Sequence, residues 1–126
     1  MTPTAEAQHR VVVLCRSQDR RALLERLVGA SETFPSAVDA CLAIARRPAR
    51  AVVVNIEDVE GVELEIVAAM RHAQPDLPIY ALVKPEDEPL GRRLLRGGAA
   101  DYFVLPTDVA RLPGILSAEG GTRSVE

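Results

Sequence analysis

The stretch AVVVNIEDVEG, residues 51–61, constrains the fold of this chain more than any other part of the sequence. Its first part, Ala51–Ile56, is a continuous run of mostly β-branched apolar residues, which is typical of a strand buried on both faces in a parallel sheet. The acidic residues that follow are too polar for such a strand, and Gly61 can end the turn before a helix-periodic segment begins. The carboxyl ends of strands form the ligand or reaction crevice in open α/β sheets, so Asn55 marks the expected site.

Four further segments have the pattern of strands, and helix-periodic segments separate them. The other predicted strands are Val11–Leu14, Ser31–Phe34, Pro78–Val83 and Tyr102–Leu105. The residues predicted to face inward from the later helices are Val38, Cys41, Leu42 and Ala45, then Leu64, Val67 and Ala68, then Leu90, Leu94 and Leu95, and finally Val109, Leu112, Ile115 and Leu116. Five alternating pairs predict a three-layer, doubly wound α/β domain with a parallel five-stranded sheet in the flavodoxin-like order 2-1-3-4-5.

Length and composition place the chain in the soluble globular class. Its 126 residues suit one domain, which we expect at residues 10–118, with a disordered tail at 1–9 and a tail or linker start at 119–126. A net charge of −3 favours neither nucleic acid nor a membrane surface as the main partner. Two cysteines form no disulfide framework, and no secretory or membrane-spanning segment is indicated, so we expect a cytoplasmic protein.

Two stretches of the sequence are similar to one known family. They are GVELEIVAAMRHAQPDLPIYALV at 61–83 and GGAADYFVLPTDVARL at 97–112. From Arg10 to about Leu116 the chain resembles the receiver domain of bacterial two-component response regulators, which implies the same flavodoxin-like fold. Receivers place a cis peptide before the proline that follows their fifth strand, so the resemblance implies a cis bond between Leu105 and Pro106.

The residues at the reaction centre depart from the receiver pattern. Receivers accept a phosphoryl group on an aspartate after the third strand, hold Mg²⁺ with an acidic pair after the first, and use a hydroxyl residue and a lysine after the fourth and fifth. The corresponding positions here are Asn55, the pair Cys15 and Arg16, then Val83 and Leu105. An amide is a poor nucleophile, a thiol and a guanidinium do not suit a hard cation, and apolar side chains cannot neutralise phosphoryl oxygens. We therefore expect no phosphoryl acceptance, metal, cofactor or enzyme activity.

The resulting hypothesis is a degenerate receiver, or pseudo-receiver, that acts as a phosphorylation-independent interaction module in bacterial signalling or transcription control. Two alternatives remain open: a regulatory domain that binds a small molecule in the crevice around Cys15, Asn55 and Val83, and a receiver with atypical phosphorylation on Asp58. Glu57 and Asp58 are more typical of solvated charge at a helix start. Cys15 is more typical of a buried structural thiol than of a redox thiol activated by the adjacent arginine.

A second candidate site lies around Tyr102, which matches the switch aromatic of receivers. Because Val83 lacks the hydroxyl that usually couples to this aromatic, the resemblance implies a Tyr102 locked in one position. Arg92, Arg93 and Arg96 lie on the short preceding helix. This helix, the fifth strand and the last helix form the face that receivers commonly use, so we expect a protein partner, an output domain or a homodimer there. Arginines without interleaved aromatic residues do not favour direct nucleic-acid binding.

Overall fold

The computed structural model describes residues 10–28, 31–59, 61–106 and 108–120. The predicted tail at residues 1–9 and most of the tail predicted at 119–126, namely 121–126, lie outside the described residues, so the domain limits stay a prediction. The strands are β1 (Val11–Leu14), β2 (Ser31–Phe34), β3 (Ala51–Asn55), β4 (Ile79–Val83) and β5 (Asp101–Val104). The helices are α2 (Gln18–Val28), α3 (Ala37–Arg46), α4 (Glu63–Ala73), α5 (Glu88–Arg96) and α6 (Leu112–Gly120). Short 3₁₀ turns are η1 (Ile56–Val59), η2 (Pro85–Asp87) and η3 (Asp108–Arg111).

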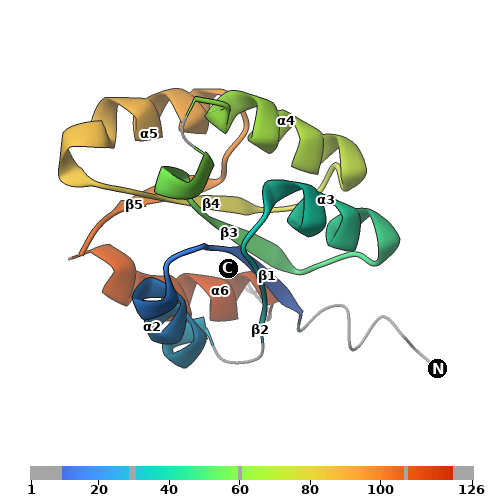
Figure 1. Ribbon diagram of the computed structural model, residues 1–126, viewed down its shortest axis with the longest axis horizontal. Helices are drawn as coiled ribbons and strands as arrows, with labels where there is room; N and C mark the ends of the chain where they lie inside the picture. Colours follow the sequence, from blue (N-terminus) through green and yellow to red (C-terminus); the bar gives the residue numbers. More distant parts are fainter. Residues whose placement is uncertain (1–9, 29–30, 60, 107, 121–126) are drawn as a thin grey trace.

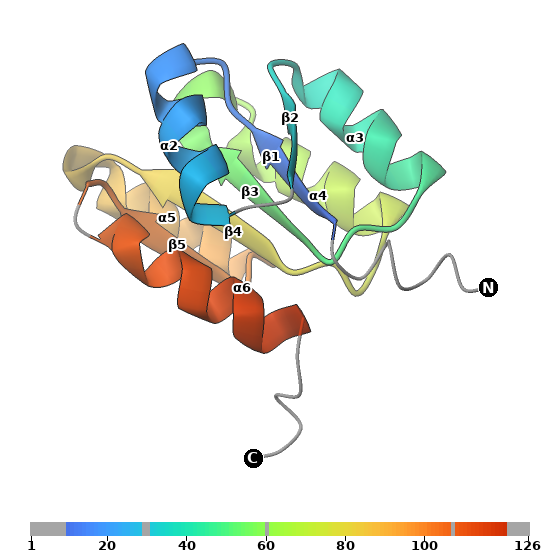
Figure 2. The same ribbon diagram turned by 90° about the horizontal axis from the view of Figure 1, so that it is seen from below.

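The five strands form one parallel sheet in the order β2-β1-β3-β4-β5, which confirms the predicted fold. Every residue of β1, β3 and β4 is buried, as expected for strands covered on both faces. Helices α3, α4 and α5 cover one face of the sheet (Figure 1), and α2 and α6 lie together on the other (Figure 2). Alternate strand residues therefore divide between two hydrophobic clusters, one on each face of the sheet.

The buried face of α3 differs from the prediction. Ala40 and Ile44 pack into the core, whereas Val38 is 67% exposed, Leu42 is 46% exposed and Ala45 is also exposed. Of the predicted residues, only the half-buried Cys41 packs against the core. The helix carries apolar residues on two neighbouring stripes, and hydrophobic periodicity cannot tell which of them faces the sheet.

Smaller corrections concern the other helices. In α4, Val67 is buried as predicted, but Leu64 and Ala68 are exposed. In α5, Leu94 is buried and Leu95 is 42% exposed. The last helix begins at Leu112. Pro113 therefore falls in its first turn, where the missing N–H of a proline needs no partner. No helix in the described ranges is long and apolar enough to cross a membrane.

A buried arginine ties the start of β1 to the end of α3. The Arg10 side chain is 8% exposed, and its guanidinium donates hydrogen bonds to the carbonyl oxygens of Ala43, Arg47 and Pro48, which terminate α3. Its Nε donates to Oε1 of Glu32 on the edge strand β2 at 3.0 Å. A cation at this position complements the negative end of the helix dipole and adds hydrogen bonds to the carbonyl groups at the helix end, among which that of Ala43 also accepts the backbone N–H of Arg47.

Arg10→Met should lower the free energy of unfolding by about 2–3 kcal/mol, because it leaves several carbonyl groups without their charged donor and leaves Glu32 with Arg47 as its remaining charged partner. Urea denaturation followed by circular dichroism would measure the change. Arg26→Met, at an exposed position of α2, is the matched control and should change stability by less than about 0.5 kcal/mol. Equal losses in the two variants would show that the Arg10 contacts contribute nothing specific.

Candidate functional site

The crevice predicted from the sequence lies at the carboxyl ends of β1, β3 and β4. Asn55 is the last residue of β3 and is fully buried, and it is in register with Leu82, the residue before Val83. Cys15, also fully buried, directly follows β1. The parallel sheet therefore brings the predicted positions to one edge, although they come from separate parts of the chain.

Both ends of the Asn55 amide are already engaged. Its Nδ2 donates to Oδ2 of Asp58 at 2.9 Å and lies 3.9 Å from Sγ of Cys15. Its Oδ1 accepts a hydrogen bond from Nη1 of Arg20 at 3.1 Å. The amide is thus held in one orientation by groups from three segments, as a buried polar group requires.

Arg20 is a site residue that the sequence analysis missed. It lies in the first turn of α2, where its backbone N–H donates to the Ser17 hydroxyl at 3.3 Å, and its guanidinium also pairs with Oε1 of Glu57 at 2.9 Å. The signal that the sequence offers is its place in the first turn of the helix that follows a strand ending at the crevice. Its partners lie more than 30 residues away, and no local pattern predicts such contacts.

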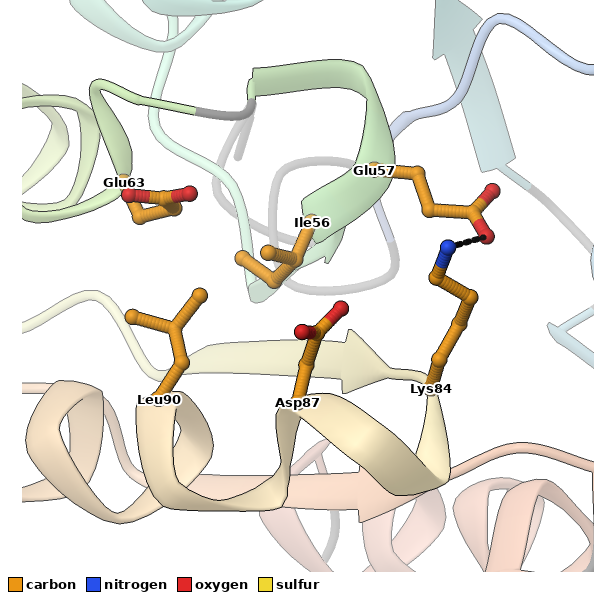
Figure 3. Close-up of a pocket in the computed structure, with 6 residues that line it drawn as sticks. All are labelled: Ile56, Glu57, Glu63, Lys84, Asp87 and Leu90. Carbon is orange, nitrogen blue, oxygen red and sulfur yellow. Dashed lines mark ion pairs between the residues drawn. The ribbon is translucent and has the colours of Figure 1, made fainter.

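The second oxygen of Glu57 faces Lys84, with 3.6 Å between Oε2 and Nζ (Figure 3). This ion pair joins η1 to the residue after β4 and borders a small pocket of about 50 Å³. The residues that line the pocket are Ile56, Glu57, Glu63, Lys84, Asp87 and Leu90. A space of this size is far below the roughly 300–1,000 Å³ that small-molecule sites usually offer.

The positive charge in the crevice comes from Arg20, not from Arg16. Arg16 is exposed, and its contact with the site is made by its backbone N–H, which donates to Oδ2 of Asp58 at 2.6 Å. Asp58 therefore accepts from both Arg16 and Asn55 through the same oxygen. Asp58 lies near the crevice, as the sequence indicated, and its carboxylate is used in hydrogen bonds to Arg16 and Asn55 within the domain.

The donor set does not fit a magnesium ion of the kind that receivers hold. Cys15 offers a soft thiol, the Asn55 carbonyl oxygen is bound to a guanidinium, and Glu57 is shared between two cations. Within the described part of the chain, no cluster of three or more His, Cys, Asp or Glu residues is arranged to hold a metal. The Arg20 side chain instead brings a fixed positive charge to the crevice.

Cys15 has the surroundings of a structural thiol. Burial and the nearby Asp58 carboxylate raise its pKa, and the opposing effects of Arg20 and Arg21 do not reverse this direction. A reactive cysteine needs a lowered pKa and access to solvent, and Cys15 has neither. This environment favours the structural interpretation over the redox one.

Val83 and Leu105, the apolar residues at the positions where receivers have a hydroxyl residue and a lysine, lie side by side at the ends of β4 and β5. The N–H of Leu105 donates to the carbonyl oxygen of Val83 at 2.8 Å, and both side chains are buried. The Leu105–Pro106 peptide is cis, which confirms the prediction. This part of the edge offers neither a hydroxyl group nor a charged group from these two positions.

Tyr102 packs closely against α5. A Cβ atom at Gly91 would lie 2.6 Å from Cδ2 of the Tyr102 ring, so the ring occupies space that only a glycine leaves open. The phenol hydroxyl donates to Oε2 of Glu88 at 3.0 Å, and Glu88 in turn pairs with Arg92 at 3.5 Å. These contacts support the prediction of a Tyr102 held in one position.

Arg93 and Arg96 extend the positive charge along the solvent side of α5. Both are exposed, and neither forms a salt bridge with any residue in the described ranges. The sequence-predicted interface residues thus divide into a held tyrosine with its paired Arg92 and two arginines that are open to a partner.

No protein-family model and no curated protein matches the sequence. Solved structures, however, share its fold. NtrX from Brucella abortus matches with a TM-score of 0.77 and 22% identity over 92% of this chain, which spans 28% of NtrX. The N-terminal receiver domain of a response regulator from Bacteroides fragilis matches with a TM-score of 0.77 and 18% identity over 90% of this chain and 97% of that domain.

The same fold also occurs in a structure named adenylate cyclase from Rhodopirellula baltica, with a TM-score of 0.78 and 15% identity over 88% of this chain and 86% of that one. The chain therefore has the receiver fold, and the resemblance stated from the sequence is confirmed at the level of structure. A fold of this kind hosts more than one function, so the function has to be argued from the site.

The contacts of Tyr102 predict an alkaline titration that can be measured. Its pKa is raised above the usual 10 by desolvation and by the Glu88 carboxylate, which accepts a hydrogen bond from the neutral hydroxyl and repels a phenolate. The tyrosinate absorbance that Tyr102→Phe removes should therefore appear above pH 10, and Glu88→Gln should move it toward 10. The stabilisation linked to this shift is fully present below the unfolded-state pKa and is lost as the pH rises through the folded-state pKa. A Tyr102 that titrates at 10 in both proteins would contradict the contact.

Proposed function

We propose that this domain is a phosphorylation-independent pseudo-receiver, a cytoplasmic protein-interaction module of bacterial signal transduction or transcription control without enzyme activity. The observation that carries the proposal is the state of Asn55. The residue at the phosphoacceptor position is a buried amide whose oxygen is bound by Arg20 and whose nitrogen is bound by Asp58. An amide in these contacts offers no nucleophile to a phosphoryl donor.

The small-molecule alternative has less support from the geometry. The crevice is occupied by the contacts of its own side chains, and the pocket beside it is small. An open groove of about 400 Å³ lies elsewhere, between β2 and α3, but two of the cations that line it, Arg10 and Arg47, are already paired with Glu32. Neither hollow combines an enclosed apolar wall with free polar groups, the usual character of a ligand site.

Atypical phosphorylation on Asp58 also has less support. Oδ2 of Asp58 accepts two hydrogen bonds, from the Arg16 N–H and the Asn55 amide, and both would be disturbed by attack on a phosphoryl group. The neighbouring positions Val83 and Leu105 provide no group that could neutralise the transferred charge, and the cations Arg20 and Lys84 are already paired with Glu57. A shifted acceptor would thus lack the other parts of the reaction centre.

The partner surface that we propose is the exposed side of α5 beside Tyr102. Arg93 and Arg96 are free to contact an acidic protein segment, and the exposed Leu95 adds apolar area on the other side of Arg96. A homodimer through this face was the other expectation from the sequence. Two-fold contact there would bring like charges of the two copies together, so we propose an acidic protein partner or output domain as the occupant.

The protein should be inert to small phosphoryl donors. Incubation with acetyl phosphate and Mg²⁺ should leave the intact mass unchanged, and magnesium titration should show no saturable site at millimolar concentration, because the acceptor and the metal ligands are absent. Asn55→Asp should remain inert as well, since it restores one carboxylate beside Arg20 but no metal ligands at Cys15 and Arg16. A mapped phosphate adduct on the wild-type chain would overturn the proposal.

Charge reversal on α5 should weaken partner capture without unfolding the domain. Arg96→Glu, alone or combined with Arg93→Glu, should reduce recovery of the partner in a pull-down from the native cell by roughly tenfold, as removal of interface charges commonly does. Asn55→Ala is the control and should change capture little, because the crevice faces its own side chains. Normal capture by the arginine variants together with loss in Asn55→Ala would return the functional site to the crevice.

A further inference from the structure

The solvent side of α3 carries an apolar stripe that has no packing partner among the residues the structure describes. Val38, Leu42 and Ala45 recur at the spacing i, i+4, i+7, so they share one side of the helix. Val38 and Leu42 are among the most exposed large apolar side chains of the described residues. Helix α3 lies at the end of its layer, next to the edge strand β2, where a second molecule can approach it (Figure 1).

Two opposite charges border this stripe. Asp39 lies three residues before Leu42 and Arg46 lies four residues after it, so the acidic group is near the start of the helix and the basic group near its end. Both are exposed, and neither side chain forms a salt bridge with another residue of the described chain. Charges placed almost symmetrically about a central leucine give the face a self-complementary pattern.

We propose that this face, defined by Val38, Asp39, Leu42, Ala45 and Arg46, binds a second copy of the same chain. In a two-fold contact the two α3 helices run antiparallel, and Leu42 of one copy meets Leu42 of the other at the axis. Asp39 of each copy then lies opposite Arg46 of the other, which gives two equivalent ion pairs around a shared apolar centre. A parallel arrangement would place Asp39 against Asp39, and a wholly acidic or wholly basic partner would match only one end of the stripe.

The self-association face and the proposed partner face are separate. Helix α4 lies between α3 and α5 in the layer (Figure 1), so a dimer through α3 leaves the arginines of α5 open. One short helix from each copy buries a small area, which places the contact among weak and transient interfaces. The domain could therefore pair with itself and bind an acidic partner at the same time.

Sedimentation velocity over a range of about 10 µM to 1 mM would test the contact, since weak interfaces dissociate in this range. The wild-type chain should show reversible dimerisation. Leu42→Asp should raise the dimer dissociation constant by about tenfold or more, because it places like charges at the two-fold axis. Leu42 is exposed, so the variant should fold normally, and circular dichroism and a thermal melt would verify this.

Charge exchange makes the test specific for the antiparallel two-fold geometry. Asp39→Arg and Arg46→Asp should each weaken dimerisation by roughly five- to tenfold, and the double variant Asp39→Arg/Arg46→Asp should restore it, because the pairs form again with reversed signs. Arg96→Glu should leave dimerisation unchanged, so this proposal and the proposed partner face can fail independently. A monomer at every concentration, a dimer insensitive to Leu42→Asp, or a double variant as weak as the single ones would overturn the proposal.

Discussion

The crevice of this domain depends on the burial of one neutral amide. Asn55 has no exposed surface, and a polar group in that position must find partners within the protein. Two cations, Arg20 and Lys84, and two carboxylates, those of Glu57 and Asp58, form a chain of contacts around it. These four charges sum to zero, and the whole cluster stays neutral because Asn55 at its centre carries no charge. A carboxylate there would face Asp58 directly, so the neutral amide and the arrangement around it are mutually dependent.

If the domain works independently of phosphorylation, as proposed, it has to signal without the usual switch of receivers. Moving a two-state population from about 1:99 to 99:1 requires a ligand that prefers one state by about 5.5 kcal/mol. The phosphoryl group supplies such a preference in receivers, and the contacts of Arg20 and Asn55 leave no place for it. Under the proposed function, regulation would come from the amount of protein or from the partners that bind its outer helices. The sheet then serves as a rigid frame that fixes the spacing of those helices.

The sequence predicted the parts of the structure that depend on local pattern. Apolar β-branched runs located the strands, and their number and alternation indicated the order of the sheet. Prediction was weaker where the local pattern allowed two arrangements. Helix α3 has two apolar stripes, and in the folded protein the stripe with Ala40 and Ile44 is the one buried against the sheet. The Arg20 contacts could not be predicted, because a long side chain finds its partners only after the strands are placed. The resemblance to receivers indicated which residues lie in the crevice. The hydrogen bonds of Asn55 with Arg20 and Asp58 could be seen only in the structure.

Because the Tyr102 ring packs directly against Gly91, a substitution at one of these two positions changes which residues the other position can accept. A glycine within a helix destabilises it by roughly 1 kcal/mol relative to alanine, so its presence in α5 needs a compensating contact. The Tyr102 ring provides this contact by packing directly against the Gly91 backbone, where a Cβ atom would lie only 2.6 Å from the ring and would clash with it. A larger residue at 91 becomes acceptable only with a smaller one at 102, and the effects of the two changes on stability cannot be additive. Related chains that differ at one of these positions would therefore be expected to differ at the other.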